Sequence, residues 1–336
     1  MKTLLLIDGN SLFHRAYHAL PPITDRSGEV ANAVFGFSNM LLKAINEVNP
    51  DYIACAFDTA APTFRHVEFE KYKAQRVEPP PDLYPQLPKV KKVLDAFGIK
   101  YFEKEGYEAD DVLATLATRS LYGTNSVIAS ETKQSQKRIA TSSTTPRNDK
   151  VGQVIILSGD RDVLQLVDGD VKVQMPGWNL KETTLYGAKD VKEKYGITPA
   201  QMVDFKSLMG DASDNIPGIA GIGPKTASSL LQKYRTLENL FRHVKETSLK
   251  VREKLEAGKD DALKAKQLVE LDRDVDLPFT INDLRFDPDW EKVRSEYQNL
   301  GFKSIVAKIP GTKEEESKVT KGSKEPKVNS NQLELV

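Results

Sequence analysis

Acidic side chains follow three of the short apolar runs in this 336-residue chain. They are Asp8 after Leu4–Ile7, Asp58 after Tyr52–Phe57, and Asp160 with Asp162 after Val154–Leu157. Each run is too short for a helix and contains no polar residue, which is typical of a strand buried on both faces. Because the carboxyl ends of parallel strands meet at one edge of an open sheet, we expect these carboxylates to share one crevice.

Two further motifs add acids to this set. Gly-Tyr-Glu-Ala-Asp-Asp contains Glu108, Asp110 and Asp111 at the start of a predicted helix, and Gly-Asp-Ala-Ser-Asp-Asn contains Asp211 and Asp214. A single aspartate of this kind is usually a turn former or a helix cap, and acids in a first helical turn are favoured by the helix dipole. The coincidence of so many element ends favours a functional cluster over that simpler explanation.

Carboxylates packed this closely repel one another. Two unit charges ~4 Å apart cost about 4 kcal/mol at an effective dielectric constant of about 20, so the cluster requires shared protons or hard cations. The chain has four histidines and one cysteine, and oxygen ligands favour Mg²⁺ or Mn²⁺. Two such ions in a carboxylate cleft are the arrangement for in-line displacement at a phosphodiester.

Short apolar runs alternate with amphipathic patterns up to about residue 195, which predicts βαβ units around a parallel sheet. Further strands are expected at Ile99–Phe102 and Val171–Met175, and helices at Ala31–Val48, Leu83–Ala96 and Ala109–Leu121. Beyond that point helices are expected at Pro199–Met209, Thr226–Tyr234, Leu237–Val244, Leu249–Ala257 and Asp260–Leu271. We therefore predict an α/β domain over residues 1–195 and a small all-helical domain over residues 196–290.

A glycine-rich stretch in the second half has the chemistry of a helix-hairpin-helix element. In Ile-Ala-Gly-Ile-Gly-Pro-Lys-Thr-Ala, Gly221 and Gly223 allow close approach of the backbone, and the following helix presents free N–H groups to a phosphate. Lys225 adds a positive charge there. A dinucleotide-binding loop is the alternative, but it requires a preceding strand, which the sequence pattern does not provide.

As a set, the motifs closely resemble those of the bacterial 5′-3′ exonucleases, a family that comprises the 5′ nuclease domain of DNA polymerase I and stand-alone relatives, kin to flap endonucleases. The resemblance covers roughly residues 1–290. The motifs are Asp8-Gly-Asn-Ser, Arg15-Ala-Tyr17, Phe57-Asp58, Tyr72-Lys73-Ala-Gln-Arg76, Glu108-Ala-Asp110-Asp111, Gly-Asp160-Arg-Asp162 and Gly-Asp211-Ala-Ser-Asp214-Asn. The resemblance implies a PIN-like parallel-sheet nuclease domain followed by a helical DNA-binding domain.

The resemblance also implies an activity. We expect a Mg²⁺-dependent enzyme, with Mn²⁺ as a substitute ion, that removes 5′ ends, 5′ flaps and RNA primers from branched or nicked DNA. The residues implied for one ion or its waters are Asp8, Asp58, Glu108, Asp110 and Asp111, and those around a second ion are Asp160, Asp162, Asp211 and Asp214. The implied DNA contacts are Arg15, Tyr72, Gly221, Gly223, Lys225 and Thr226. A K⁺ ion near Gly221–Gly223 is implied by the likeness alone.

The segment from Phe64 to Arg76 resembles the arch that covers the active site in this family. Arg65, Lys73 and Arg76 are expected to clamp the scissile phosphate and to stabilise the charge that develops on it. Tyr72 is expected to stack on an unpaired base. The simpler explanation is a solvated helix face, because two glutamates interrupt the basic run.

Composition excludes several classes of protein. Lys and Arg total 48, as do Asp and Glu, so the chain is not coated with positive charge. Cys55 is the only cysteine, which excludes a disulfide framework and a cysteine-based zinc site. No apolar run approaches the ~20 residues of a membrane span, and the N-terminal run is too short for a signal peptide. We expect a cytoplasmic, nucleoid-associated monomer with no membrane partner.

Two segments depart from the family pattern. Residues 124–150 are polar and lie between a helix and a strand, at the amino edge of the predicted sheet, so we predict a flexible insertion that catalysis does not need. Residues 311–336 are predicted to form a disordered tail. The length leaves no room for a polymerase domain, so we expect a free-standing nuclease, and a piece of a longer polymerase is the alternative.

Two other functions remain open. A PIN-type endoribonuclease would use a similar acid-lined sheet edge but would not need the helix-hairpin-helix element. A non-catalytic protein that binds DNA junctions would keep the fold and lose acids, whereas all nine acidic positions are filled here.

Overall fold

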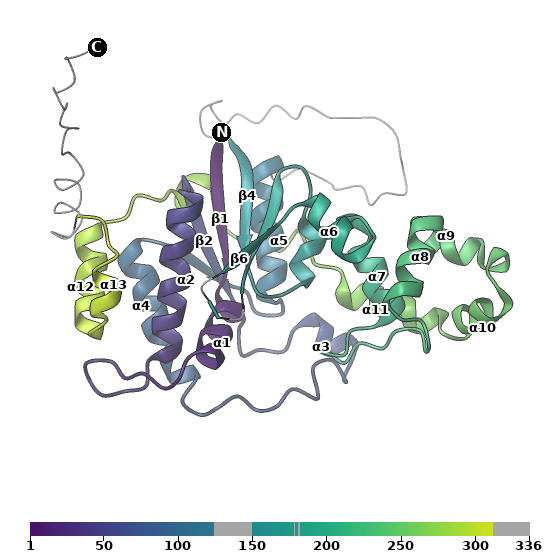
Figure 1. Cartoon of the computed structure of the whole chain (residues 1–336), viewed down its shortest axis with the longest axis horizontal. Coiled ribbons are helices and arrows are strands. Elements are labelled where there is room, and N and C mark those ends of the chain that lie inside the picture. Colours follow the sequence, from purple (N-terminus) through teal and green to yellow (C-terminus); the bar gives the residue numbers. More distant parts are fainter. Residues whose placement is uncertain (124–149, 178, 181, 312–336) are drawn as a thin grey trace, which may run out of the picture.

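The computed structural model describes residues 1–123, 150–177, 179–180 and 182–311 (Figure 1). Its strands are β1 (Lys2–Asp8), β2 (Tyr52–Phe57), β3 (Lys100–Glu103), β4 (Val151–Leu157), β5 (Val171–Pro176) and β6 (Thr183–Tyr186). Within the described residues these form one sheet in the order β3-β2-β1-β4-β5-β6. The first five strands are parallel, and β6 pairs antiparallel with β5. The predicted parallel sheet is therefore confirmed, and β6 adds an antiparallel strand at its edge that was not predicted, because so short a strand leaves no clear pattern in the sequence.

The predicted insertion at 124–150 and the predicted tail at 311–336 fall outside the described residues, apart from Lys150 and Gly311. In the part of the chain that is described, no helix combines the length and the apolar character that crossing a membrane requires.

Helices cover both faces of the sheet (Figure 1). They are α1 (Gly9–Ala19), α2 (Asn32–Val48), α4 (Leu87–Phe97) and α5 (Ala109–Tyr122), whereas the short helix α3 (Phe64–Glu68) lies off the sheet. Successive side chains of the central strand β1 point to opposite faces: Leu4 and Leu6 pack with α5, whereas Leu5 and Ile7 pack with α1, α2 and α4. Truncating one of these buried leucines to alanine would cost ~2–5 kcal/mol of stability.

The chain then forms a group of helices that extends from one side of the sheet (Figure 1). They are α6 (Ala188–Tyr195), α7 (Met202–Met209), α8 (Pro224–Tyr234), α9 (Leu237–Arg242), α10 (Leu249–Ala257) and α11 (Lys259–Val269). Short 3-10 turns lie at η1 (Tyr84–Gln86), η3 (Asp162–Leu166), η4 (Pro199–Gln201), η5 (Val244–Glu246) and η6 (Ile281–Leu284). The apolar side chains of this group share one core with α5, so the helical part is packed firmly on the sheet.

After α11 the chain returns to the sheet. The N–H of Phe286 donates to the carbonyl of Asp51 at 2.9 Å, and two last helices follow, α12 (Trp290–Leu300) and α13 (Lys303–Val306). Val293 and Tyr297 of α12 are buried in the same core as α2 and α4. The α/β part is therefore built from both ends of the chain, which the sequence analysis did not predict.

Candidate active site

Asp8 ends β1 and caps α1. One carboxylate oxygen accepts a hydrogen bond from the N–H of Ser11 at 2.9 Å, and the other from Oγ of Ser158 at 2.5 Å. Asp8 is 3% exposed. Burial raises its pKa to about 7, and the charges of Asp160 and Asp58 act in the same direction, although the two hydrogen bonds oppose the shift.

Asp58 follows β2 and lies at the N-terminus of α5. Its carboxylate accepts hydrogen bonds from Nδ2 of Asn10 at 2.8 Å and from the N–H of Ala109 at 2.7 Å. Burial and the charge of Glu108 raise its pKa, against the effect of the Ala109 bond. Asn10 belongs to the Asp-Gly-Asn-Ser motif, but the sequence analysis gave it no role.

Asp110, in the first turn of α5, lies in the field of these acids. Burial raises its pKa well above the usual range, and the charges of Asp8, Asp160 and Asp58 add to that effect. Carboxylates from the ends of three strands and from one helix therefore act on each other at the carboxyl edge of the sheet, as predicted.

Lys206 of α7 connects two further acids. Its ammonium pairs with Asp162 and, at 2.6 Å, with Asp211. Asp162 donates its N–H to Oδ1 of Asp160 at 2.9 Å, which links this group to the strand ends. Burial alone would raise the pKa of Asp211, but the charge of Lys206 and the hydrogen bonds from Lys206 and Ser213 together outweigh it, and the pKa is lowered. Lys206 was not among the predicted site residues.

Glu108 and Asp214 are held by the predicted basic segment. Lys73 Nζ lies 2.5 Å from a carboxylate oxygen of Glu108 and 3.8 Å from one of Asp214. Arg76 pairs with Asp214 at 2.7 Å, and its side chain is 54% exposed. The hydroxyl of Tyr72 donates to both acids, at 2.9 and 3.2 Å. Lys73 and Arg76 thus lie at the acidic edge, where they were predicted.

Asp111 and Arg65 have a different role from the predicted one. Arg65 is 1% exposed and Asp111 is fully buried, and the two form a bidentate pair with N···O distances of 2.6 and 2.8 Å. Arg65 also donates to the carbonyls of Leu268 and Glu270, and the N–H of Asp272 donates to Asp111. Because N–H donors surround both oxygens of Asp111, it is not available as a metal ligand, and Arg65 cannot reach a phosphate.

Tyr72 is also buried, at 3% exposure. Its ring packs in a small cluster with Ile216, Leu268 and Val269. The predicted stacking on an unpaired base is therefore wrong, because neither face of a ring buried in this way can receive a base.

The predicted DNA contacts occupy two places. In the helical part, Gly221 has a positive φ of 75°, Gly223 caps α8, and Lys225 and Thr226 lie in the first turn of that helix. At the sheet edge, Arg15 of α1 donates through Nε to the carbonyl of Gly177 at 3.3 Å. The start of α8 thus has first-turn N–H groups without helical partners, and phosphate binding there stays a prediction.

The K⁺ ion expected near Gly221–Gly223 stays a prediction. Nζ of Lys254, on α10, donates to the carbonyl of Gly221 at 2.8 Å, so the ammonium of a side chain contacts this turn.

The described residues contain no group of three or more Asp, Glu, His or Cys side chains that is arranged to hold a metal ion. The acids are brought to one edge, but Asp162, Asp211 and Asp214 turn towards cations. The donor set nevertheless fits a hard divalent ion. Its ligands are oxygens, and the raised pKa values of Asp8, Asp58 and Asp110 reflect burial first and mutual repulsion second, both of which such an ion would offset.

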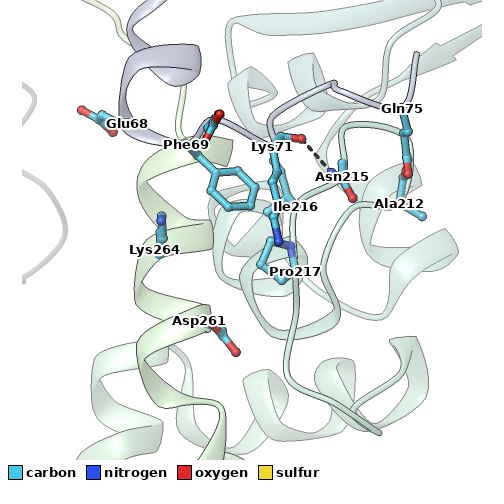
Figure 2. A pocket seen from close by; sticks show the side chains of 11 residues that line it. Glu68, Phe69, Lys71, Gln75, Ala212, Asn215, Ile216, Pro217, Asp261 and Lys264 are labelled. Atoms are coloured by element: carbon cyan, nitrogen blue, oxygen red, sulfur yellow. Dashed lines mark hydrogen bonds between the residues drawn. The ribbon is translucent and has the colours of Figure 1, made fainter. Parts of the chain in front are cut away.

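A pocket of about 690 Å³ lies beside this edge (Figure 2). It is bounded by the segment that follows α3, by the loop from Asp211 to Ile216 (the acidic loop) and by α11, and Phe69, Ile216 and Pro217 form its apolar part. Three acids and two lysines share its lining, and none of the nine predicted metal ligands is among them. The pocket therefore adjoins the candidate site without belonging to it.

Two family models match the chain. The N-terminal resolvase-like domain of the 5′-3′ exonucleases matches residues 3–137, and their C-terminal SAM fold matches residues 197–292. The chain therefore belongs to the 5′-3′ exonuclease family, a family of metal-dependent nucleases, as the motifs predicted.

Curated relatives agree. DNA polymerase I of Caldicellulosiruptor bescii is 39% identical over 311 residues, which cover 91% of this chain and 33% of that protein. DNA polymerase I of Bacillus subtilis is 36% identical over 311 residues, which cover 92% of this chain and 32% of that protein. The chain thus spans about a third of the length of these relatives.

Solved structures confirm the fold. A complex of bacteriophage T5 flap endonuclease with DNA and metal ions has a TM-score of 0.59 and 16% identity, with 91% of this chain and 96% of that chain covered. The catalytic core of Rad2 in complex with DNA substrate has a TM-score of 0.55 and 18% identity, with 92% of each chain covered.

Proposed function

We propose that this chain hydrolyses phosphodiester bonds at the 5′ ends and 5′ flaps of branched or nicked DNA, including RNA primers, and that Mg²⁺ is its metal ion. The observation that carries the proposal is the convergence of Asp8, Asp58, Asp110 and Asp160 at one edge of the sheet. The anion-binding turn before α8 supports a nucleic acid as the substrate.

Asp8, Asp58 and Asp110 would hold one ion, with Glu108 beside them. The residues that would surround a second ion are Asp160, Asp162, Asp211 and Asp214. Bound divalent ions would supply an activated water and would offset the charge of the leaving oxygen. Mn²⁺ has the same preference for oxygen ligands and should replace Mg²⁺.

The chain's own cations bind and orient the DNA. Arg76, with its exposed side chain, and Lys73 are placed to hold the phosphate next to the acids. Thr226 and the free N–H groups of α8 bind phosphates of the duplex, with Lys225 as a nearby charge. Because these contacts are to the backbone, binding should weaken steeply with salt and depend little on sequence.

The test uses three substrates of equal length: a 5′-flap duplex, a blunt duplex and a single-stranded RNA. Each is incubated with the protein in Mg²⁺ and in EDTA, and the products are mapped. We expect cleavage of the flap duplex near the branch, in Mg²⁺ only. Equal cutting of the RNA would instead favour an endoribonuclease, and flap binding without cutting would favour a junction-binding protein.

We also propose that the active form is a monomer that acts on nucleoid DNA in the cytoplasm. Light scattering of the protein alone and of its complex with the flap duplex tests the first part, and a mass of two chains would contradict it.

A further inference from the structure

The loop that carries Asp211 and Asp214 is closed on itself. The N–H of Asp211 donates to the carbonyl of Ile216 at 2.9 Å, and the N–H of Ile216 donates to the carbonyl of Asp211 at 2.8 Å. Asn215 lies in this loop with a positive φ of 57°, a conformation that asparagine tolerates better than most residues. The side-chain amide of Asn215 points out of the loop, towards Lys71 (Figure 2).

That amide holds a segment from the other domain. Nδ2 of Asn215 donates to the carbonyl of Lys71 at 2.7 Å, and the N–H of Lys73 donates to the carbonyl of Asp214 at 3.0 Å. The two bonds hold the main chain on either side of Tyr72. Lys73 has a positive φ of 54°, which a lysine adopts only where its surroundings enforce it.

We infer that Asn215 is a positioning residue. Through the carbonyl of Lys71 it holds the segment 71–73 in the conformation that brings Lys73 Nζ to the acidic edge, 2.5 Å from Glu108. The loop and the segment belong to different parts of the chain, and the Asn215 bond adds to the contacts that Tyr72, Lys73 and Arg76 make with Asp214. This inference rests on the proposed function, because Lys73 is placed there to hold the phosphate.

The simpler explanation is that Asn215 does no more than shape its own loop. The buried ring of Tyr72 and the bond from Gln75 to the carbonyl of Ala212 would then hold the segment without it. The two explanations predict different behaviour for a variant that loses the amide donor but keeps the left-handed backbone.

Two substitutions at Asn215 produce such a variant. Asn215→Gly removes the amide, adds no charge and suits a positive φ. Asn215→Asp keeps the size but replaces the donor with an acceptor that faces a carbonyl. Asn49 is the matched control, because it is exposed, has a positive φ of 47° and ends α2 away from the acids. The same two changes at Asn49 should leave cleavage unchanged.

We expect kcat for the flap duplex to fall roughly 10- to 100-fold in both Asn215 variants, as is typical of a displaced catalytic group, with little change in KM. Combined with Lys73→Ala, either variant should be no slower than Lys73→Ala alone, because both changes remove the same group. In EDTA, trypsin should cut the Asn215 variants after Lys71, Lys73 or Arg76 several-fold faster than it cuts the Asn49 variants.

Wild-type kcat in Asn215→Gly, with unchanged trypsin cutting, would overturn the inference. The inference would also be overturned if the fold-losses in kcat of Asn215→Gly and Lys73→Ala multiplied in the double variant. If the unsubstituted protein cuts no flap, the proposed function fails instead, and the trypsin comparison still decides whether Asn215 holds the segment.

Discussion

Six acids of the candidate site fall into two groups with opposite electrostatics. The unpaired group, Asp8, Asp58 and Asp110, has raised pKa values, and within the described residues none of the three forms an ion pair. The cation-paired group, Asp162, Asp211 and Asp214, is bound by Lys206, Lys73 and Arg76.

The difference arises from where each group is built. The unpaired group is fixed by strand ends and by the N-termini of α1 and α5, whose N–H groups offset only part of the charge. Two members of the cation-paired group lie on a loop of the helical part, which the basic segment contacts. Under the proposed function, the unpaired group would therefore depend most on a divalent ion, whereas the cation-paired group has internal substitutes for one.

The largest effect is expected for Asp110→Asn. Flap cleavage should fall on the order of 10³-fold, because a metal ligand is lost. In EDTA the variant should melt at a higher temperature than the unsubstituted protein, because the repulsion from Asp8, Asp58 and Asp160 is relieved. The stabilisation by Mg²⁺ should shrink at the same time. Single-turnover rates and thermal unfolding with and without Mg²⁺ measure both effects.

The exposed Asp287 supplies the control, since Asp287→Asn removes the same charge away from the acids. Wild-type cleavage by Asp110→Asn, or a lower melting temperature in EDTA with full stabilisation by Mg²⁺, would break the distinction between the two groups.

The next effect concerns stability rather than metal binding. Asp111→Asn should lower the free energy of unfolding by ~3–5 kcal/mol, because it leaves the buried guanidinium of Arg65 without its partner. The Mg²⁺ concentration that gives half-maximal cleavage should stay unchanged. Arg65→Met should destabilise similarly, and the double variant should lose little more. Denaturant unfolding and Mg²⁺ titration of cleavage separate this result from that of a metal ligand, which would shift the titration.

The contrast between Asp110 and Asp111 marks the limit of prediction from sequence. The apolar runs predict the strands, because a strand buried on both faces requires an unbroken apolar run. The parallel arrangement of these strands then places Asp8, Asp58 and Asp160 at one edge. Neighbouring helical residues point in directions about 100° apart. Which of the two acids faces the cleft depends on Arg65, whose partners also include the distant carbonyls of Leu268 and Glu270.

Helix α12 was not predicted, although the sequence contains a signal for it. Val293, Tyr297 and Leu300 recur at the spacing of one helix face, and this stripe is the buried side of α12. By contrast, Lys206 precedes Asp211 by only a few residues, and its pairing with Asp162 depends on how α7 packs on the sheet domain. The local pattern gives the element, whereas only the tertiary arrangement gives the ion pair.

A smaller effect is expected for Lys206→Met. In EDTA the free energy of unfolding should fall by ~1–3 kcal/mol, because two acids lose their shared partner. Mg²⁺ should recover much of that loss, so the variant should gain more stability from the ion than the unsubstituted protein does. Thermal unfolding across a Mg²⁺ titration tests this, with the exposed Lys189→Met as the control. An equal gain in both proteins would show that Lys206 and the ion do not act on the same acids.

The smallest effect is expected at the opposite edge of the sheet. Residues 124–149 connect the end of α5 to the start of β4, at the amino edge, whereas both acid groups lie at the carboxyl edge. Replacing these residues by a short Gly-Ser linker should leave kcat, KM and the Mg²⁺ dependence of flap cleavage unchanged, because shortening a loop changes closure entropy by only ~0.6 kcal/mol per twofold change in length. The matched comparison inserts the same linker after Ala212, between Asp211 and Asp214, where cleavage should be lost. If the first replacement also abolished cleavage in a protein that still melts cooperatively, chemistry at the carboxyl edge would depend on the amino edge, and the two acid groups alone would not account for the activity.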